Sequence, residues 1–316
     1  MKSRVTYSKP SITALEDTDA RDTASPTIVV TGGTGFVGRE VLPLLIKAGF
    51  NIRLVVRTLP ADREPNSNLQ IIRSPNLFAE SHDWWSSVCG GANQVLHLAW
   101  IAAPGKYLDS EINSECLQGT VALAQGAIAA GVRHFTGIGT CLEYAPSSEP
   151  IPTSHPLQPK SVYAKCKVTA FESLSQFFAA AGVGFAWCRL FHMFGDHESP
   201  LRLGGYLRDC FLQDRVAELS DGRDVLDFSN VFDVAASLEK VVSYCVVGPL
   251  NICSGQAQTV RQFAENYAAS RGKLHLLKFK EPSMNMATIQ HLVGVPSALV
   301  TDLVANNSGD LKNEPS

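Results

Sequence analysis

Short runs of β-branched and other apolar residues alternate with longer segments of helical periodicity along most of the chain. Residues 28–30 form the first run, and apolar side chains then recur at helical spacing from residue 37 to residue 48. Similar short runs predict strands at 51–57, 69–72, 94–99, 134–139 and 185–188. Helical spacing predicts helices over 114–130, 157–183 and 231–247. Strands that alternate with helices of this length are typical of a doubly wound parallel sheet, so we expect an α/β fold.

The first strand passes into the first helix through a glycine-rich turn at residues 31–38. This order leaves free backbone N–H groups and the positive helix end where a pyrophosphate can bind. A tight turn also needs glycine for purely conformational reasons, but the strand-to-helix context favours dinucleotide binding. Pro43, inside the predicted helix, should remove a hydrogen bond or cause a kink. The predicted cofactor contacts in the turn are Gly32, Thr34, Gly35, Phe36, Val37 and Gly38.

The second strand ends about 20 residues after the glycines, where a carboxylate would bind the adenosine ribose of NAD. This chain has Arg57 and Thr58 there. A guanidinium suits a 2′-phosphate and no carboxylate repels it, so the sequence favours NADP(H) and leaves NAD(H) open. The plain alternative is a solvated arginine at a strand end. Leu98 and Ala99, which follow the fourth strand, are further expected cofactor contacts because ligands bind beyond the carboxyl ends of parallel strands.

Three polar residues fall where such a sheet places its chemistry. Thr140 ends the fifth strand, and Tyr163 and Lys167 are four residues apart, hence on one face of the following helix. Reducing a ketone by hydride transfer builds negative charge on oxygen, so a proton donor must stand beside it. We therefore expect Tyr163 to donate the proton, Lys167 to lower the phenol pKa and hold the nicotinamide ribose, and Thr140 to orient the substrate oxygen.

Composition narrows the choice of partners. The chain has 316 residues, 45% hydrophobic and 18% charged, and its net charge of -3 gives no electrostatic case for nucleic acid or an anionic membrane. No apolar run approaches the roughly 20 residues of a membrane span. Eight cysteines without a Cys-x-x-Cys pair suit reduced thiols in a cytoplasmic protein better than disulfides or a metal site. Residues 1–26 are polar, and we expect a flexible tail there.

Together these motifs resemble the extended short-chain dehydrogenase/reductase family. The matching pieces are Thr31-Gly32-x-x-Gly35-x-x-Gly38, Thr140, Tyr163-x-x-x-Lys167, Asp233 and Asn251-Ile252-Cys253-Ser254-Gly255. The resemblance implies a Rossmann-type nucleotide domain, from 27–190 plus about 228–252, and a smaller C-terminal substrate lobe, from about 191–227 plus 253–316. Most members of the family act on nucleotide-linked sugars.

Two stretches, 139–144 and 189–195, look most like the subgroup that reduces nucleotide-linked 4-keto-6-deoxyhexoses. The resemblance therefore implies an NADPH-dependent ketoreductase of deoxysugar biosynthesis with a dTDP- or CDP-linked substrate. Relatives that dehydrate such sugars carry an Asp-Glu pair after the strand-end threonine, whereas this chain has Cys141 and Leu142. Neither can act as a carboxylate acid or base, so dehydration is not expected. Cys116 also stands where the family places a helix asparagine, with Asn113 nearby but out of register.

The substrate side departs from the family as well. Leu226 stands where relatives often carry a phosphate-binding arginine, and His192 where many carry a substrate-binding asparagine. Arg202, Arg208 or Arg223 could replace the missing arginine, although each taken alone is by default an exposed charge. The expected substrate contacts are Trp100, Cys141, His192 and Arg202.

Three other functions fit parts of the same pattern. A nucleotide-sugar 4-epimerase would use the same residues with retained NAD, and Arg57 argues against it. A carbonyl reductase for a non-nucleotide ketone would explain Cys116 and Leu226. A nonenzymatic NADP(H) sensor would have no need of the catalytic residues. Many relatives pair through helices that flank the site, so the resemblance also allows a homodimer.

Overall fold

The computed structural model describes residues 11–12, 25–58, 68–103, 105–281, 289–298 and 300–302. Its largest sheet has the strand order β1-β11-β7-β6-β5-β2-β3-β4. These strands are β1 (Ser11–Ile12), β2 (Thr27–Thr31), β3 (Asn51–Val56), β4 (Leu69–Arg73), β5 (Gln94–His97), β6 (His134–Thr140), β7 (Gly184–Leu190) and β11 (Val246–Ile252). All pairings in this sheet are parallel except β1 with β11. The expected doubly wound α/β fold is confirmed.

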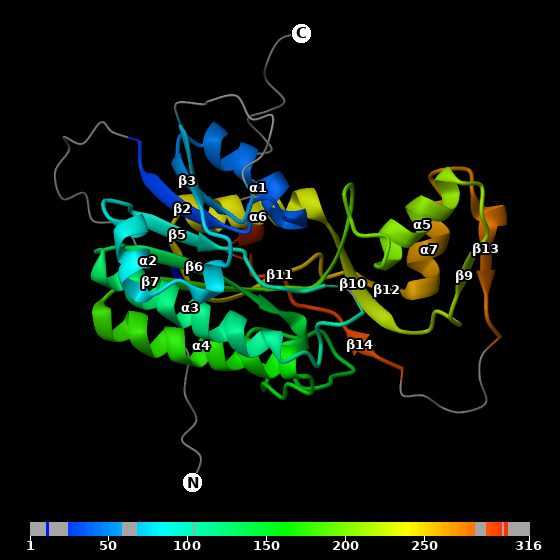
Figure 1. The fold of residues 1–316 in the computed structure, drawn as a ribbon. Coiled ribbons are helices and arrows are strands. Elements are labelled where there is room, and N and C mark those ends of the chain that lie inside the picture. Colours follow the sequence, from blue (N-terminus) through cyan, green and yellow to red (C-terminus); the bar gives the residue numbers. More distant parts are fainter. Residues whose placement is uncertain are drawn as a thin grey trace.

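Helices cover both faces of this sheet (Figure 1). One face carries α1 (Phe36–Lys47) and α6 (Val231–Ser243), which pack on each other and share an apolar cluster with β2, β3 and β7. The other face carries α2 (His82–Cys89), α3 (Ile112–Ala129) and α4 (Val162–Ala181), with a cluster that includes Trp85, Leu123 and Leu174. Burial of both faces explains why the strands read as continuous apolar runs. No helix among the described residues is long and apolar enough to cross a membrane.

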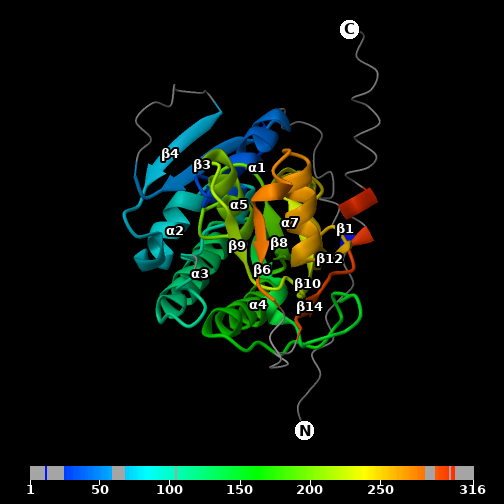
Figure 2. The ribbon, with the colours of Figure 1, turned by 90° about the vertical axis from the view of Figure 1, so that its right-hand side faces the viewer.

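The remaining elements form a smaller lobe beside the carboxyl ends of the parallel strands (Figure 1). Its strands are β8 (His192–Phe194), β9 (Ala217–Leu219), β10 (Val225–Asn230), β12 (Ala257–Thr259), β13 (Leu277–Phe279) and β14 (His291–Leu292). Its helices are α5 (Leu203–Leu212) and α7 (Val260–Ala269). Figure 2 turns this lobe toward the viewer and shows α5 and α7 together in front of the sheet. Three short 3-10 turns, η1 (Leu77–Ala79), η2 (Cys141–Glu143) and η3 (Leu274–Leu276), complete the elements.

Three details differ from the sequence-based expectations. The helix predicted over 231–247 ends at Ser243, and the parallel strand β11 begins at Val246; residues 241–247 are apolar except for Ser243 and contain no glycine or proline that would mark the boundary in the sequence. α1 continues through Pro43, whose exposed side chain faces solvent. Ser11–Ile12, inside the expected flexible tail, pair with β11, while most of 1–26 lies outside the described residues.

Candidate active site

The glycine turn fits closely between β2, α1 and the end of β5. A side-chain carbon on Gly32, whose φ is +72°, would stand 2.6 Å from the backbone nitrogen of Ala99. A side-chain carbon on Gly38 would collide with the backbone of Gly32 and Gly33. Gly35 caps α1 without a side-chain hydrogen bond, so no side chain occupies the N–H groups at the start of the helix. The turn therefore offers backbone donors and the positive helix end to an anion.

A cavity of about 410 Å3 begins at this turn and extends along the carboxyl ends of β5, β6 and β7. The predicted residues that line it are Gly32, Gly35, Phe36, Val37, Gly38, Leu98, Trp100, Thr140, Cys141, Tyr163, Lys167, His192 and Arg202. Three predicted cofactor contacts lie outside its wall. Thr34 and Arg57 have exposed side chains, and Ala99 is buried beneath Gly32, with its N–H donating to Thr31 Oγ1.

The strand-end threonine and the two helix residues come together as the sequence predicts. Thr140 ends β6, and Ser161 caps α4 by accepting a hydrogen bond from the backbone N–H of Ala164. This cap places Tyr163 in the first turn of α4 and Lys167 one turn later. A side-chain hydrogen bond links Tyr163 and Thr140. Lys167 Nζ donates to the backbone oxygen of Ile138, 2.7 Å away.

The electrostatics of this pair differ from the expectation. Burial lowers the pKa of Lys167 to about 7, while the Glu143 carboxylate opposes that shift. Burial raises the pKa of Tyr163 above its ordinary value, and the neighbouring Tyr107 and Glu143 raise it further. The Lys167 ammonium does not outweigh these effects: it lies over Trp100, 3.7 Å from that ring centroid, and is 5.8 Å from the Tyr163 ring centroid. The predicted lowering of the phenol pKa is therefore wrong for this structure.

A buried acid stands directly behind the cavity wall. Glu143 is 0% exposed, and its Oε1 accepts a 2.8 Å hydrogen bond from the backbone N–H of Thr140. Its Oε2 lies 2.6 Å from Nε of the equally buried Arg189, and Trp187 Nε1 donates to both carboxylate oxygens. Sequence reasoning missed this residue. Thr140 and Glu143 form a capping box, and their spacing was the signal that could have revealed it.

The substrate side of the cavity holds two of the predicted contacts. His192 Nδ1 is buried without a hydrogen-bond partner among the described residues, and burial lowers the pKa of His192 to about 4. Arg202 caps α5 and lines the cavity. Arg208 and Arg223 do not line it, because Arg208 donates to backbone oxygens of the β8–α5 loop and Arg223 pairs with Asp221. Among the described residues that line the cavity there is no carboxylate.

Leu226 and Cys141 also depart from the pattern that the family resemblance implies. Leu226 is buried in an apolar cluster with Phe191 and Leu292, so it offers nothing to a phosphate. Burial raises the pKa of the Cys141 thiol to about 12, so this group stays neutral at ordinary pH. Tyr107, His197 and Ser199 also line the cavity and were not predicted, because they lie in irregular loops with no periodic pattern.

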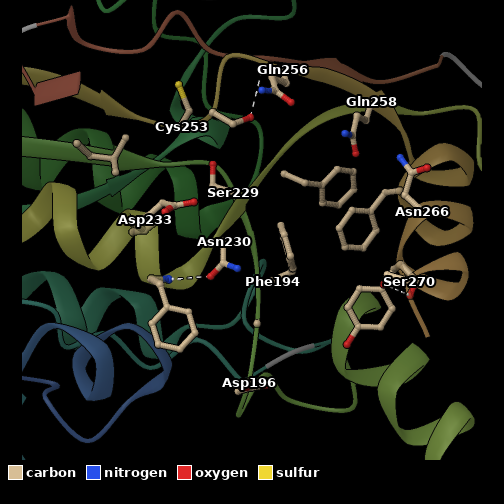
Figure 3. A pocket seen from close by; sticks show the side chains of 18 of the residues that line it. Phe194, Asp196, Ser229, Asn230, Asp233, Cys253, Gln256, Gln258, Asn266 and Ser270 are labelled. Atoms are coloured by element: carbon tan, nitrogen blue, oxygen red, sulfur yellow. Dashed lines mark hydrogen bonds between the residues drawn. The ribbon is translucent and has the colours of Figure 1, made fainter. Parts of the chain in front are cut away.

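Two further cavities lie outside this site. One, of about 570 Å3, opens between α6 and α7, with Asn230 and Asp233 on one side and Phe194, Gln258 and Asn266 around it (Figure 3). It contains none of the predicted catalytic residues. The other, also about 570 Å3, meets the active-site cavity at Cys141 and Leu142, and residues of the 144–148 and 289–292 segments contribute to its lining.

Comparison with known proteins decides the family. The sequence profile of the NAD dependent epimerase/dehydratase family matches residues 28–252. The chain belongs to this family. It is therefore an NAD(P)-dependent enzyme of the extended short-chain dehydrogenase/reductase type, as the motifs predicted.

Relatives within the family are distant in sequence. The chain is 23% identical over 263 residues to dTDP-6-deoxy-L-talose 4-dehydrogenase (NAD(+)) of Aggregatibacter actinomycetemcomitans, a match that covers 82% of this chain and 94% of the relative. The fold of this chain is similar to that of DesIV, a dTDP-glucose 4,6-dehydratase from Streptomyces venezuelae solved with NAD bound. The TM-score is 0.74 at 18% identity, and the match covers 88% of this chain and 91% of DesIV. It is equally similar to UDP-glucose 4-epimerase from Thermus thermophilus in complex with NAD (TM-score 0.74, 20% identity, 87% and 92%).

Proposed function

We propose that this enzyme uses NADPH to reduce the 4-keto group of a dTDP- or CDP-linked 4-keto-6-deoxyhexose. The observation that carries the proposal is the meeting of Thr140, Tyr163 and Lys167 at a cavity that reaches the glycine turn and has no carboxylate among its described lining residues. Such a cavity has a proton donor for a reduction but no acid–base pair for dehydration. The substrate class is that of the relative named as a dTDP-6-deoxy-L-talose 4-dehydrogenase.

The residues fit a bound dinucleotide. Side chains are excluded from the turn at Gly32 and Gly38, and the start of α1 has no side-chain cap, as a close approach of pyrophosphate requires. The nicotinamide supplies the hydride when it is bound. We assign the cofactor to the larger domain, 27–190 plus about 228–252, and the substrate to the lobe from about 191–227 plus 253–316.

In the reduction, Tyr163 gives the proton and Thr140 orients the oxygen that receives it. Burial keeps the Tyr163 phenol protonated at neutral pH, since it raises the pKa, and a protonated phenol is the form that reduction consumes. The Lys167 ammonium, behind Tyr163 on the same helix face, stabilises the negative charge that forms when the proton leaves. Because burial raises its pKa to about 12, the Cys141 thiol stays protonated at neutral pH and offers no thiolate base beside the substrate.

Arg57 supports NADPH over NADH. Its exposed side chain directly follows β3, the strand whose end meets the adenosine ribose in dinucleotide-binding sheets. Replacing Arg57 by Gln should weaken NADPH about tenfold and leave NADH unchanged, because a charge-assisted hydrogen bond to the 2′-phosphate is lost. Arg73→Gln, at the end of β4, is the matched control. Equal affinity of the wild type for both cofactors, measured by fluorescence titration, would remove this preference.

A 4-epimerase with retained NAD is the competing function, since similar folds include epimerases. An epimerase begins by oxidising its substrate and needs the phenolate, which burial of Tyr163 disfavours. The deciding experiment follows NADPH consumption against dTDP-, CDP-, GDP- and UDP-linked keto sugars, with simple ketones as controls. We expect turnover with a dTDP- or CDP-linked keto sugar only. Copurified stoichiometric NAD with sugar inversion and no NADPH use would establish the epimerase, and turnover of simple ketones alone would establish a carbonyl reductase.

A further inference from the structure

We propose that Asn113 is a positioning residue, which fixes Trp100 and Tyr107 against the catalytic pair so that the indole face of Trp100 becomes the partner of the Lys167 ammonium. This inference rests on the proposed roles of Tyr163 and Lys167. It gives a new role to Trp100, which the sequence assigns to substrate binding.

Asn113 uses its whole side-chain amide within this cluster. It is 0% exposed, and its Oδ1 accepts a 2.8 Å hydrogen bond from Trp100 Nε1. Its Nδ2 donates to the backbone oxygens of Tyr107, at 2.6 Å, and Ser110, at 2.8 Å. A buried amide with donors and acceptor all engaged has one favourable orientation, so it holds both partners in place.

Both aromatic residues that Asn113 holds contact the proposed catalytic pair. The rings of Tyr107 and Tyr163 are 4.8 Å apart at 84°, and those of Trp100 and Tyr163 are 6.1 Å apart at 78°. These are edge-to-face arrangements, which restrict the direction of the phenol. Lys167 Nζ lies 3.7 Å from the centroid of the Trp100 ring.

The ammonium needs such a partner. Lys167 is 3% exposed, and among the described residues its hydrogen bonds are limited to the one with Ile138. The nearby Glu143 carboxylate is already engaged by Arg189, Trp187 and the Thr140 backbone. A buried cation without a carboxylate partner is stabilised by the electron-rich face of an indole.

In this arrangement Asn113 supplies the amide that the family resemblance places at position 116. Cys116, at the family position, accepts a hydrogen bond from the backbone N–H of Ile101. The amide that orders the site comes instead from Asn113, one turn earlier on α3. The loop that carries Trp100 and Tyr107 thereby becomes part of the catalytic wall.

A test that needs no substrate uses the indole N–H signals of 15N-tryptophan-labelled protein. We expect one of the four indole signals, assigned to Trp100 by its loss in Trp100→Phe, to shift with a midpoint near pH 7, the pKa of Lys167. Lys167→Met should abolish that titration, and Trp84→Phe, in α2, should leave it unchanged. An indole signal of Trp100 that does not titrate, or that titrates in Lys167→Met, would overturn the proposal.

Activity supplies the second test. Asn113→Leu should lower kcat about tenfold or more with little change in substrate KM, because the reacting groups lose their alignment. Trp100→Phe keeps an aromatic face but loses the hydrogen bond to Asn113, so its kcat should fall less than that of Trp100→Leu, whose alkaline limb in the pH profile should also move to lower pH. Equal kcat values and equal profiles for the two Trp100 variants would refute the role, even if Asn113→Leu fails to fold. Should no keto sugar react, the proposed function fails, and the indole titration still decides this inference.

Discussion

Tyr163 and Lys167 line one wall of the cavity from a helix of 20 residues packed against the central sheet, whereas His192 and Arg202 line a second wall, from a three-residue strand and the cap of a ten-residue helix. On the first wall each polar group has a partner. On the second, His192 Nδ1 has none among the described residues. Under the proposed function, a rigid scaffold holds the chemistry, while short elements that can change independently carry substrate recognition.

The largest expected effect tests the rigid wall. Tyr163→Phe should lower kcat by about 10²–10⁴-fold, the usual contribution of a positioned general acid, because it removes the phenol that is hydrogen-bonded to Thr140. Affinity for NADPH, measured by fluorescence titration, should remain nearly unchanged. Tyr244→Phe, at a 40% exposed position outside the cavity, is the matched control. Retention of most activity by Tyr163→Phe would remove this residue from the mechanism.

A second change tests the support behind that wall. Glu143→Gln should lower the free energy of unfolding by about 3–5 kcal/mol, because it leaves the buried Arg189 without its counter-charge. Urea denaturation measures the difference. Glu265→Gln removes one partner of an exposed pair with Arg261 and should change stability by under about 1 kcal/mol. If both variants lose the same small amount, the Glu143–Arg189 pair is not a support of the site.

The pH dependence of kcat distinguishes Lys167 from His192 without any mutation. The Lys167 ammonium predominates below its pKa of about 7 and is lost above it, so kcat for reduction should fall as pH rises through that value, approaching tenfold per unit. Tyr163 stays protonated throughout this range because its pKa is raised, and His192, with a pKa of about 4, stays neutral. Steady-state kcat between about pH 5 and 9 tests this. A rate that rises across neutral pH would contradict the assigned protonation states.

The smallest effect belongs to the substrate wall. Arg202→Gln should raise KM for the nucleotide-linked substrate about tenfold and leave kcat nearly unchanged, since it removes one charge-assisted hydrogen bond to a phosphate. Arg223→Gln, which breaks only the pair with Asp221 outside the cavity, should change neither constant. A drop in kcat with unchanged KM would move Arg202 from binding to chemistry and erase the contrast between the walls.

The sequence predicted the rigid wall well because each of its signals is local. A glycine turn, a strand-end threonine and a Tyr-x-x-x-Lys pair have fixed spacings, and the parallel sheet brings them together at one edge. The family comparison confirms the fold that those spacings predicted. The helix predicted over 231–247 overlaps the start of β11 because residues 241–247, apolar except for Ser243, contain no glycine or proline that marks the boundary.

The environment of the site could not be predicted in the same way. The pKa of Tyr163 depends on its burial and on the distance of the Lys167 ammonium from its ring, and neither follows from residue spacing. Asn113, Trp100 and Tyr107 meet only because an irregular loop folds back onto α3. Contacts made by loops leave no periodic trace in a sequence.

The close packing around Gly38 restricts substitution in the glycine turn much more than at Arg57. A side chain there would have to displace the backbone of Gly32 and Gly33, so the phosphate cradle cannot be altered piecemeal. Arg57, exposed just past β3, is under no comparable restraint. With the proposed role of Arg57, a single surface substitution would exchange one cofactor for the other, whereas the shape of the glycine turn depends on the backbone itself.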